Sequence, residues 1–576
     1  MSKKKPTTSS KPAPVPEPPS ETPEKKPATA KKAARKTPTE SAPKVPVKPG
    51  APKTTAAKPR ASRAPSVTAA KGTAAKPRRK AATPSVEGKP RGLRILMVTP
   101  EAHPFAKSGG LAEVAGSLPA ALVRQGHEVT VVLPRYRGAA PDARAHRRTE
   151  LVLGPRTFDV GYVEQALSDG VRMVLVDAPA LFDRPGLYGT DGQDYPDNAL
   201  RFAVLSRAAL EFARIEGQRP DVIHAHDWQT GLVPVYQKMH LSADPVMGGV
   251  PVIFTIHNLA FQGVFGREAL QALGLGWEVL DPNALEYWGN ISLLKGGVNF
   301  SEAITTVSPS YAREILTPEL GFGFDGALRR RAGDLVGILN GIDTNRWNPE
   351  TDEFAPHFSR TDLDGKREAK RALLEAVGLD TGTAALDRPL IGLVSRLTDQ
   401  KGFDLIGAAL EPLMALGAGW VMLGSGEPHY EAQWRDLAAS HPDRVATTIG
   451  FDERLAHLIE AGADMFLMPS RFEPCGLNQL YSLRYGTVPI VRATGGLRDT
   501  VIDAAQPDGN GVVFENFAPN ELVEAVRRAL ALYGDRTRWQ ALQRAGMTAD
   551  RSWDVSAREY VKVYERTTAR ASHERR

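Results

Sequence analysis

The chain lacks long apolar segments that could anchor it in a membrane, and it lacks the cysteines needed for disulfide bonds. It contains a single cysteine, Cys475, so no intramolecular disulfide can form, and a reducing compartment fits. No stretch of about 18 consecutive apolar residues occurs, so we expect no transmembrane helix. The first residues, MSKKKPTTSSKP, lack the apolar run of a secretory signal. These absences predict a cytoplasmic protein without a membrane segment.

Residues 1–92 contain no aromatic side chain and almost no large aliphatic one beyond valine. Such a segment buries too little apolar surface to offset the entropy of ordering, so we predict a disordered tail. It carries 23 Lys and Arg against 5 Asp and Glu, a net of +18, which leaves −11 for the remainder of the chain. Two alternatives stay open for this basic tail, namely an arm that binds nucleic acid or another polyanion, and an organelle transit peptide.

The remaining chain predicts an α/β fold that begins with a Rossmann-like unit. Residues 94–98 are a short apolar run typical of a buried parallel strand, and residues 112–124 repeat apolar side chains at helical spacing. A second strand follows at 128–134. Pro119 lies inside the predicted helix, so we expect a kink or a break there. The GxGxxG fingerprint is missing from this unit, which disfavours a dinucleotide dehydrogenase.

A glycine pair stands at the start of that helix, in the run Lys107-Ser108-Gly109-Gly110-Leu111. Gly109 and Gly110 let backbone N–H groups approach an anion at the helix N-terminus. Lys107 adds a mobile positive charge. A tight loop with a surface lysine is the plainer interpretation, and the motif alone does not decide between the two.

This run resembles the K-T-G-G-L signature of bacterial glycogen synthases and plant starch synthases, with Ser108 in place of Thr. The similarity to that family covers about residues 93–570. It implies two Rossmann-like domains facing across a cleft (the GT-B arrangement), with residues 93–334 on the acceptor side and 335–551 binding the nucleotide sugar. It also implies that residues 552–576 form a helix crossing back to the first domain. Further segments carry the same resemblance: 177–186, 195–202, 220–229, 251–263, 335–343, 396–402 and 464–480.

Polar side chains follow two predicted strands of the first domain. Asp227 comes after an apolar run that ends at 226, and His257 comes after the run 251–256. Because parallel strands present their carboxyl ends at one edge of a sheet, we expect Asp227 and His257 to share a crevice. A satisfied helix cap or a core histidine is the alternative for either residue alone. The resemblance implies that Asp227 lies near the reacting sugar and that His257 contacts its 6-hydroxyl region.

Two cations follow a predicted strand of the second domain, Arg396 and Lys401. A nucleotide-sugar donor loses a diphosphate, and fixed cations stabilise the charge that develops on it in the transition state. Arg396 offers a planar fork for phosphate oxygens and Lys401 a compact charge. No aspartate-rich metal motif appears, so we predict no metal and no cofactor, with this pair in place of a divalent ion.

The strongest motif is the run 464–480, in which a strand leads into a loop carrying Glu473. Glu473 can accept hydrogen bonds from sugar hydroxyls, and a helix starting near Gly476 and Leu477 can bind phosphate through its N–H groups. We interpret Cys475, inside the motif, as a small buried residue. The resemblance implies that Glu473 orients the donor glucose. It assigns further donor contacts to Asn340, Gly495 and Gly496.

The resemblance therefore implies a glucosyltransferase of the glycogen synthase type. It would move glucose from ADP-glucose to the non-reducing end of an α-1,4-glucan with retention, in glycogen biosynthesis. Only one carboxylate is well placed, and no Asp/Glu pair appears at hydrolase spacing. Two alternatives stay open: another two-Rossmann transferase that uses UDP-glucose or makes a sucrose-type product, and a catalytically inactive scaffold that binds glucan or nucleic acid.

Overall fold

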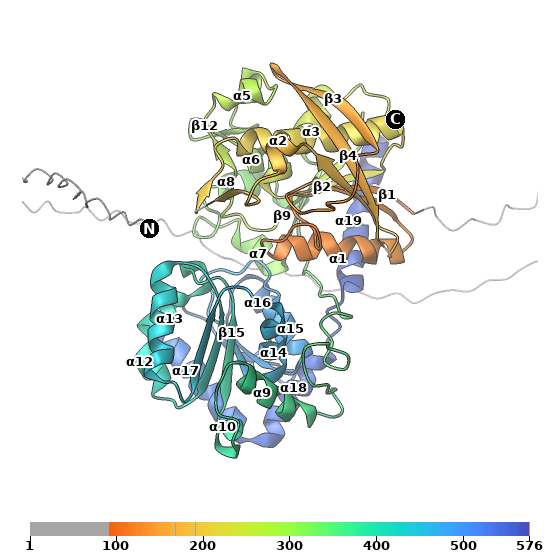
Figure 1. The fold of residues 1–576 in the computed structure, drawn as a ribbon. Helices are drawn as coiled ribbons and strands as arrows, with labels where there is room; N and C mark the ends of the chain where they lie inside the picture. Colours follow the sequence, from red (N-terminus) through yellow and green to blue (C-terminus); the bar gives the residue numbers. More distant parts are fainter. Residues whose placement is uncertain (1–91, 168, 191, 575–576) are drawn as a thin grey trace, which may run out of the picture. The chain divides into compact units, whose positions relative to one another are not determined.

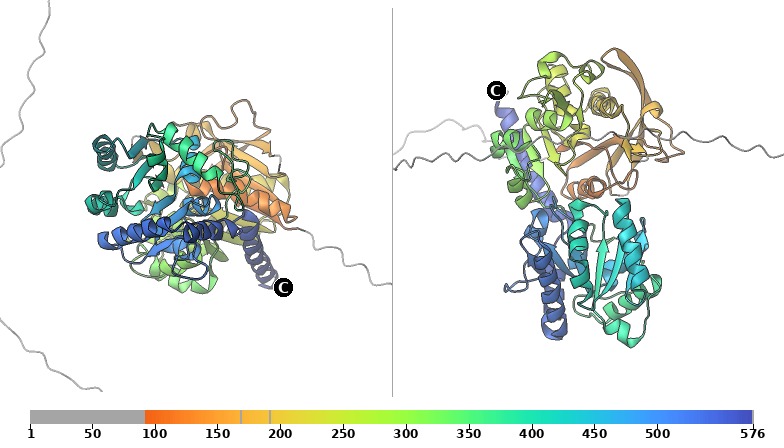
Figure 2. Two further views of the ribbon diagram at one scale, coloured as in Figure 1. Left: turned by 90° about the horizontal axis from the view of Figure 1, so that it is seen from below. Right: turned by 90° about the vertical axis from the view of Figure 1, so that its left-hand side faces the viewer.

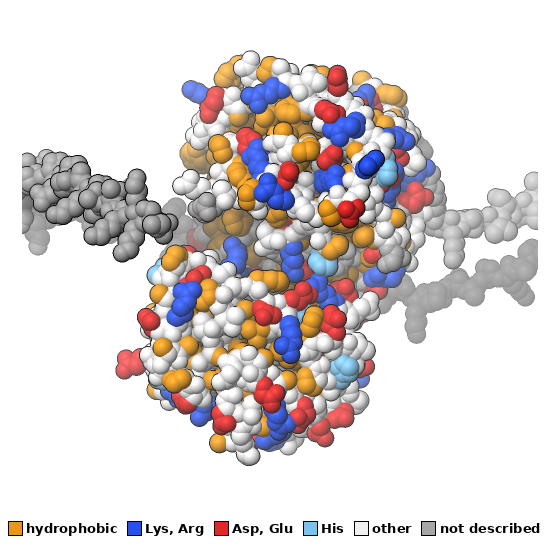
Figure 3. Space-filling view, viewed as in Figure 1, with side chains coloured by type: hydrophobic (Ala, Val, Ile, Leu, Met, Phe, Trp, Pro, Cys, Tyr) orange, Lys and Arg blue, Asp and Glu red, His pale blue; other side chains and the backbone are white. Residues whose placement is uncertain are grey.

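The computed structural model describes residues 92–167, 169–190 and 192–574, so the predicted basic tail lies, apart from Gly92, outside the described residues. The described chain is α/β throughout, with two large sheets and helices on their faces (Figure 1). On the face drawn in Figure 3, basic and acidic side chains are interspersed. Within the described residues, no helix is both long enough and apolar enough to cross a membrane.

The first half of the chain is built on a nine-stranded sheet with the order β14-β13-β9-β8-β1-β2-β5-β4-β3. From β14 through β5 the strands run parallel, and β4 and β3 continue the sheet with antiparallel pairs. Its strands are β1 Arg94–Val98, β2 Glu128–Pro134, β3 Arg147–Leu153, β4 Arg156–Ala166, β5 Arg172–Asp177, β8 Val222–His226, β9 Val252–Ile256, β13 Ala303–Thr306 and β14 Leu335–Gly337. Their near-continuous Val, Ile and Leu content suits strands covered on both faces.

The second half is built on a six-stranded, all-parallel sheet with the order β17-β16-β15-β18-β19-β20. Its strands are β15 Leu390–Val394, β16 Gly419–Gly424, β17 Val445–Ile449, β18 Met465–Met468, β19 Val488–Arg492 and β20 Val512–Phe514. Small antiparallel ladders occur in the first half: β6 Gly189–Thr190 with β7 Gln193–Asp194, and β10 Val264–Phe265, β12 Asn290–Ser292 and β11 Glu286–Tyr287.

Helices connect the strands in both halves. Those of the first half are α1 Gly110–Arg124, α2 Pro179–Phe182, α3 Asn198–Glu216, α4 Leu232–His240, α5 Ala269–Ala272, α6 Leu293–Phe300, α7 Pro309–Glu314 and α8 Asp325–Arg330. Those of the second half are α9 Gly365–Ala376, α10 Thr383–Asp387, α11 Phe403–Ala408, α12 Leu410–Met414, α13 Pro428–Ser440, α14 Glu453–Gly462, α15 Asn478–Arg484, α16 Gly495–Thr500, α17 Pro519–Gly534 and α18 Arg536–Thr548.

The two sheets share one topology. The chain starts in a central strand, moves outward on one side through β1, β2 and β5, and then returns to add β8, β9 and β13 on the other side. The second sheet does the same with β15, β16 and β17, followed by β18, β19 and β20. Where the order reverses, the loops after the two central strands diverge and leave room for a ligand. These positions are the ends of β1 and β8 in the first half, and of β15 and β18 in the second.

Two details of the first half differ from the sequence-based expectations. Helix α1 runs through Pro119 without interruption, so the break considered there is absent. Strand β14 pairs with β13, so Leu335–Gly337 extends the first sheet although the predicted domain boundary precedes it. We propose that the boundary follows residue 337.

The C-terminal helix α19, Trp553–Glu574, packs on the first half rather than on the sheet that precedes it in sequence (Figures 1 and 2). Its buried side chains recur at helical spacing, which gives the helix one apolar face. They are Trp553, Ala557, Tyr560, Val563 and Tyr564, and they share a cluster with Ile95 and Met97 of β1. The Arg124 guanidinium on α1 also bonds to Asp554 at 2.7 Å.

Candidate active site

The carboxyl ends of β15 and β18 bring Lys401 and Glu473 into contact. Lys401 Nζ donates to Glu473 Oε2 at 2.6 Å, and Ser470 Oγ donates to the same oxygen at 2.9 Å. Glu473 is only 4% exposed. Two donors on one buried carboxylate hold its side chain in a single orientation. A cation and an anion thus meet at the point where the strand order reverses.

The loop that carries Lys401 lies against the loop that carries Glu473 because Gly402 has no side chain. Gly402 has φ +81°, and a Cβ there would lie 2.2 Å from the carbonyl oxygen of Pro469. The Arg471 N–H also donates to the Gln400 carbonyl at 2.9 Å. Arg396, on the same loop as Lys401, is exposed, and its Nη2 donates to the Gln400 side chain at 3.3 Å. The structure therefore brings Lys401, but not Arg396, into contact with Glu473.

Gly495 and Gly496 lie against the backbone of the Glu473 loop. A Cβ on Gly495 would lie 1.9 Å from the Glu473 carbonyl oxygen, and one on Gly496 would lie 2.2 Å from that of Cys475. The Gly496 N–H donates to the Glu473 carbonyl at 3.1 Å, and the Gly495 N–H donates to the Glu314 carboxylate at 2.8 Å. Both N–H groups are thus engaged within the protein, and the pair supports the loop that holds Glu473.

The segment after Glu473 faces the first half. Helix α15 begins at Asn478, slightly later than expected, with Leu477 at its N-cap and Gly476 at φ +73°. Leu477 Cδ1 lies 3.7 Å from where a Cβ on Gly110 would stand, so two predicted site elements meet. Asn340 is buried, and its Oδ1 has no hydrogen-bond partner among the described residues. Burial raises the pKa of the Cys475 thiol to about 12, as suits a structural cysteine.

Asp227 stands at the carboxyl end of β8 with φ +56° and ψ 178°, a backbone conformation that side chains other than glycine rarely adopt. Its Oδ1 accepts a hydrogen bond from the His257 backbone N–H at 2.7 Å. Burial raises the pKa of Asp227 from 3.8 to about 7, although hydrogen bonds from the His257 and Asn258 backbones act in the opposite direction. A strained, desolvated carboxyl at a strand end is a common property of functional sites.

His257 is the end of a row of buried histidines. Its Nε2 lies 3.0 Å from His226 Nδ1, and the two rings are 5.2 Å apart between centroids. His226 Nε2 is buried without a partner among the described residues, and its ring lies 4.0 Å from that of His224. Burial lowers the pKa of His257 and of His224 to about 3, so both rings are neutral at pH 7. His257 is therefore a hydrogen-bonding group here and not a cation.

Lys107, in the predicted anion-binding loop, lies close to Phe451 of the second half. Lys107 Nζ donates to Glu113 Oε1 at 2.5 Å and lies 5.8 Å from the centroid of the Phe451 ring. At Gly109 a Cβ would meet nothing within 4 Å, and φ there is −162°. Neither packing nor backbone strain requires that glycine, so its missing side chain leaves open space at the start of α1.

Sequence analysis missed Glu101, which follows β1 at the same sheet edge as Asp227. The buried Glu101 carboxylate accepts hydrogen bonds from the Ser108 N–H and Oγ, each at 2.5 Å, and from the Tyr188 hydroxyl. Glu101 thereby fixes the loop that carries Lys107. The strand-end argument used for Asp227 would have found it. Tyr188 gave no such signal, because its loop has no regular pattern.

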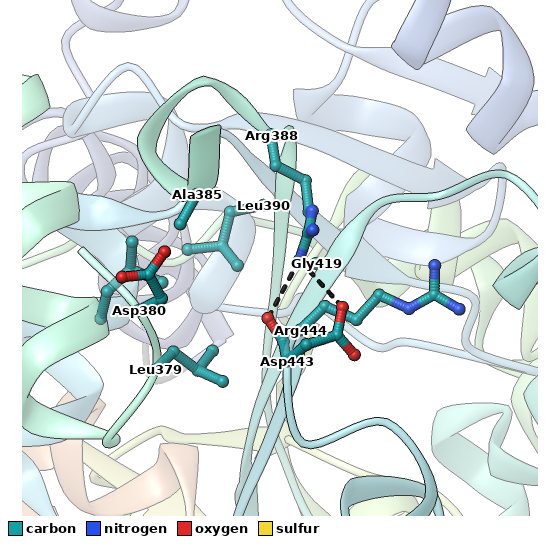
Figure 4. Close-up of a pocket in the computed structure, with 9 residues that line it drawn as sticks. Leu379, Asp380, Ala385, Arg388, Leu390, Gly419, Asp443 and Arg444 are labelled. Atoms are coloured by element: carbon teal, nitrogen blue, oxygen red, sulfur yellow. Dashed lines mark hydrogen bonds and ion pairs between the residues drawn. The ribbon is translucent and has the colours of Figure 1, made fainter. Parts of the chain in front are cut away.

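Two shallow pockets lie away from these residues. One, in the second half, is bounded by Arg388, Gly419 and Asp443, near the amino ends of β15, β16 and β17 (Figure 4). The other includes Arg94, Glu128 and Arg172 at the amino ends of β1, β2 and β5. Ligands of open parallel sheets bind at the opposite edge, so neither pocket is our candidate. Among the residues that the structure describes, no three His, Cys, Asp or Glu side chains are grouped to bind a metal ion.

Comparison with known proteins agrees with the two-sheet fold. Residues 94–330 match the family model for the starch synthase catalytic domain, and residues 381–545 match that for group 1 glycosyl transferases. A sucrose-phosphate synthase from Thermosynechococcus elongatus has the same fold, with TM-score 0.54, 18% identity, and coverage of 83% of this chain and 99% of its own. The fold and the two family matches together define a glycosyltransferase built on two Rossmann-like sheets.

Proteins with higher sequence identity show which family of glycosyltransferases this chain belongs to. Glycogen synthases of Anaeromyxobacter dehalogenans and Myxococcus xanthus are 50% and 48% identical, each over 82% of this chain and 99% of its own length. The catalytic domain of starch synthase IV from Arabidopsis thaliana, bound to ADP and acarbose, superposes with TM-score 0.78 at 34% identity, covering 83% of this chain and 100% of its own. The chain belongs to the glycogen synthase family.

Proposed function

We propose that this protein transfers glucose from ADP-glucose to the non-reducing end of an α-1,4-glucan with retention of configuration, in glycogen biosynthesis. The observation that carries the proposal is the contact of Lys401 with the buried Glu473 at the carboxyl edge of the second sheet. The similar starch synthase IV domain was solved with ADP and acarbose, which supports an adenine nucleotide and an α-glucan. UDP-glucose remains the competing donor.

The second half would hold the donor. Lys401 has three N–H donors, so it can keep its bond to Glu473 while a second donor reaches a phosphate oxygen. Arg396, exposed on the same loop, would turn its guanidinium fork toward the diphosphate. Charge on the departing diphosphate grows toward the transition state, and these cations stabilise it there more than in the ground state. Glu473 would orient the glucose through its hydroxyls.

The first half would hold the reacting sugar and the acceptor. Asp227 lies beside the backbone of His257, so the two would face one sugar, with the neutral His257 ring bonding at its 6-hydroxyl. The acceptor hydroxyl would attack from the side that the diphosphate leaves, and the leaving phosphate would take its proton. Further contacts are proposed for Lys107, Gly109, Gly110, Asn340, Gly476, Leu477, Gly495 and Gly496.

Turnover of ADP-glucose and of UDP-glucose, compared on purified protein with glycogen as acceptor, tests the donor. We expect ADP-glucose to be the better substrate by kcat/KM. Analysis of the product linkage tests the stereochemistry, because retention requires an α-linkage. A preference for UDP-glucose, or a β-linked product, would refute the respective part of the proposal.

Glu473→Ala and Lys401→Ala should each lower kcat by on the order of 10²-fold, if each group supplies a few kcal/mol to the transition state. Because the two side chains act in contact, the double variant should lose about as much as the worse single variant and not the product of both losses. Arg388→Ala, at the opposite edge of the same sheet, is the matched control and should keep full activity.

A cytoplasmic location and polyanion binding by residues 1–92 remain predictions from sequence. Removal of residues 1–90 should leave turnover unchanged, and should abolish retention on a heparin column only if the basic tail binds polyanions.

A further inference from the structure

An exposed tryptophan occupies a strained position in the first half. Trp288 and Gly289 form the two-residue turn between β11 and β12, with φ +52° and +82°. Such turns favour Asn-Gly, because a bulky side chain is unfavourable in the left-handed region. Trp288 is also 82% exposed. The Trp288 side chain hydrogen-bonds to Tyr287, but the mostly exposed ring adds little to the core, and strain of this kind often marks a binding position.

Trp288 belongs to a group of aromatic residues gathered around one carbonyl oxygen. The Phe322 carbonyl accepts hydrogen bonds from Gln262 Nε2 at 2.8 Å and from the Tyr287 hydroxyl at 3.0 Å. The chain neighbours of those two donors are Phe261, which is 51% exposed, and Trp288. Phe322 itself is half-buried and has φ +48°. Phe261, Trp288 and Phe322 are therefore neighbours in the fold, and we name this group the aromatic patch.

The aromatic patch is continuous with the candidate active site. The Phe322 ring packs edge-on against the Phe472 ring, with 5.1 Å between centroids. Phe472 directly precedes Glu473, the carboxylate that contacts Lys401. The Phe322 ring thus connects the aromatic patch to the residue that precedes Glu473. The position of the patch thus suits the part of a long substrate that lies beyond the reacting end.

We propose that the aromatic patch binds the α-glucan acceptor, with sugar rings stacked on Trp288 and Phe261. This inference rests on the proposed function. Pyranose rings are uncharged and present faces of C–H groups, which pack on the electron-rich faces of aromatic rings. An exposed apolar surface rimmed by polar groups is typical of a binding site. A protein partner, including a second copy of this chain, is the competing occupant.

Trp288→Asn separates binding from folding, because asparagine suits the left-handed turn better than tryptophan. We expect the thermal midpoint to stay unchanged or rise, and KM for ADP-glucose to stay unchanged. KM for glycogen should rise about tenfold, as expected for loss of a stacked aromatic contact. The rise in KM should be smaller with maltotriose, because this short glucan extends only a little way beyond its reacting end. Trp277→Asn is the matched control, since Trp277 is 68% exposed but lies outside the patch.

Calorimetric titration with maltoheptaose tests the patch without turnover. Weaker maltoheptaose binding by Trp288→Asn than by the parent and by Trp277→Asn supports the proposal. This result would hold even if the protein turned over no donor and the proposed function were wrong. Equal affinities for all three proteins overturn it. A change of oligomeric state in Trp288→Asn, with glucan affinity unaffected, would also overturn it and assign the patch to a protein interface.

Discussion

Asp227 carries two unfavourable features at once, a strained backbone with positive φ and a buried carboxyl group. Since burial raises its pKa from 3.8 to about 7, the folded protein holds the proton more tightly than the unfolded chain. Its contribution to stability is therefore complete below about pH 4 and is lost as pH rises through about 7. Above that range the ionised carboxylate destabilises the fold.

Asp227→Asn removes this titration and keeps an oxygen that can accept from the His257 N–H. We expect the thermal midpoint of the variant to exceed that of the parent at pH 8, and the gap to close toward pH 4. Thermal unfolding of both proteins across pH 4 to 8 measures it. A gap that is the same at every pH would show that the Asp227 pKa is not raised. Activity should fall, because Asp227 is a proposed sugar contact.

His226 sets the tautomer of His257 in this geometry. An unbonded buried N–H costs more than an unbonded ring lone pair, so the His226 proton belongs on Nδ1, which then donates to His257 Nε2. His257 in turn carries its proton on Nδ1. His226→Phe keeps a ring in the stack but removes that donor.

We expect His226→Phe to change the ¹⁵N imidazole shifts of His257 toward a mixture of tautomers. It should also reduce the preference for ADP-glucose over its 6-deoxy analogue, because His257 would no longer present a fixed donor. Tyr564→Phe, which removes the hydroxyl 2.8 Å from His224 Nδ1, is the control and should leave that preference unchanged. An unaltered preference in His226→Phe would contradict the assignment.

At the scale of single residues, the sequence predicts which residue types belong to the site, but it does not predict the hydrogen bonds between them. Strand-end reasoning predicted Lys401 and Glu473, and it had no means to predict that they bond to each other. Gly495 and Gly496 were assigned to the donor by resemblance alone. Their N–H groups bond to Glu314 and to the Glu473 carbonyl. Glu314 is remote in sequence, so no local pattern could reveal that contact.

At the scale of elements, two short helices from different halves cap one another. Asp499 on α16 accepts from the Ser310 N–H and Oγ, each at 2.7 Å, at the start of α7. Glu314, at the end of α7, accepts from the Gly495 N–H at the start of α16. Each helix N-terminus is thus neutralised by a carboxylate of the other helix.

Asp499→Ala leaves the Ser310 N–H without its partner and should lower the free energy of unfolding by about 1 to 2 kcal/mol. Amide exchange at Ser310 and Gly495 should quicken, because the two helices would separate more often. Chemical denaturation and hydrogen exchange measure the two effects. Glu524→Ala, on the exposed face of α17, is the control and should change neither.

The course of α1 shows why element boundaries were only partly predictable. A proline inside a helix costs about 3 kcal/mol, which favours a break at Pro119. The helix nevertheless buries Leu111, Val114, Leu118 and Leu122, each worth about 1.5 to 3 kcal/mol. Their sum exceeds the cost of the proline, so the helix continues. The extent of that burial depends on α19, which packs on α1. The local sequence around Pro119 carries no sign of this packing.

At the scale of the whole chain, the two segments that cross between the halves run side by side. The Ile342 N–H donates to the Arg551 carbonyl at 2.8 Å, and Ile342 pairs with Ser552 in a parallel bridge. Gly341 allows this approach, because a Cβ there would lie 2.6 Å from the Trp553 backbone. The sequence signalled the fold class of each half, but not this contact between distant segments.

Gly341→Ala should therefore push the two crossing segments apart. We expect a lower thermal midpoint and a lower kcat, since the two halves, proposed to bind the donor and the acceptor, would be positioned less accurately. Gly333→Ala is the matched control, because a Cβ at Gly333 meets nothing within 4 Å. Equal thermal midpoints for the two variants would show that the crossing tolerates the methyl group.

The packing of α19 also has a consequence for biosynthesis. The cluster around β1 includes Trp553, Tyr560 and Tyr564. The ribosome therefore synthesises all strands of the second sheet before it synthesises the α19 side chains that complete the core of the first half. Until then the nascent first half exposes an apolar groove along α1, which is a natural target for chaperones. The first half is thus synthesised first, but its core is completed last.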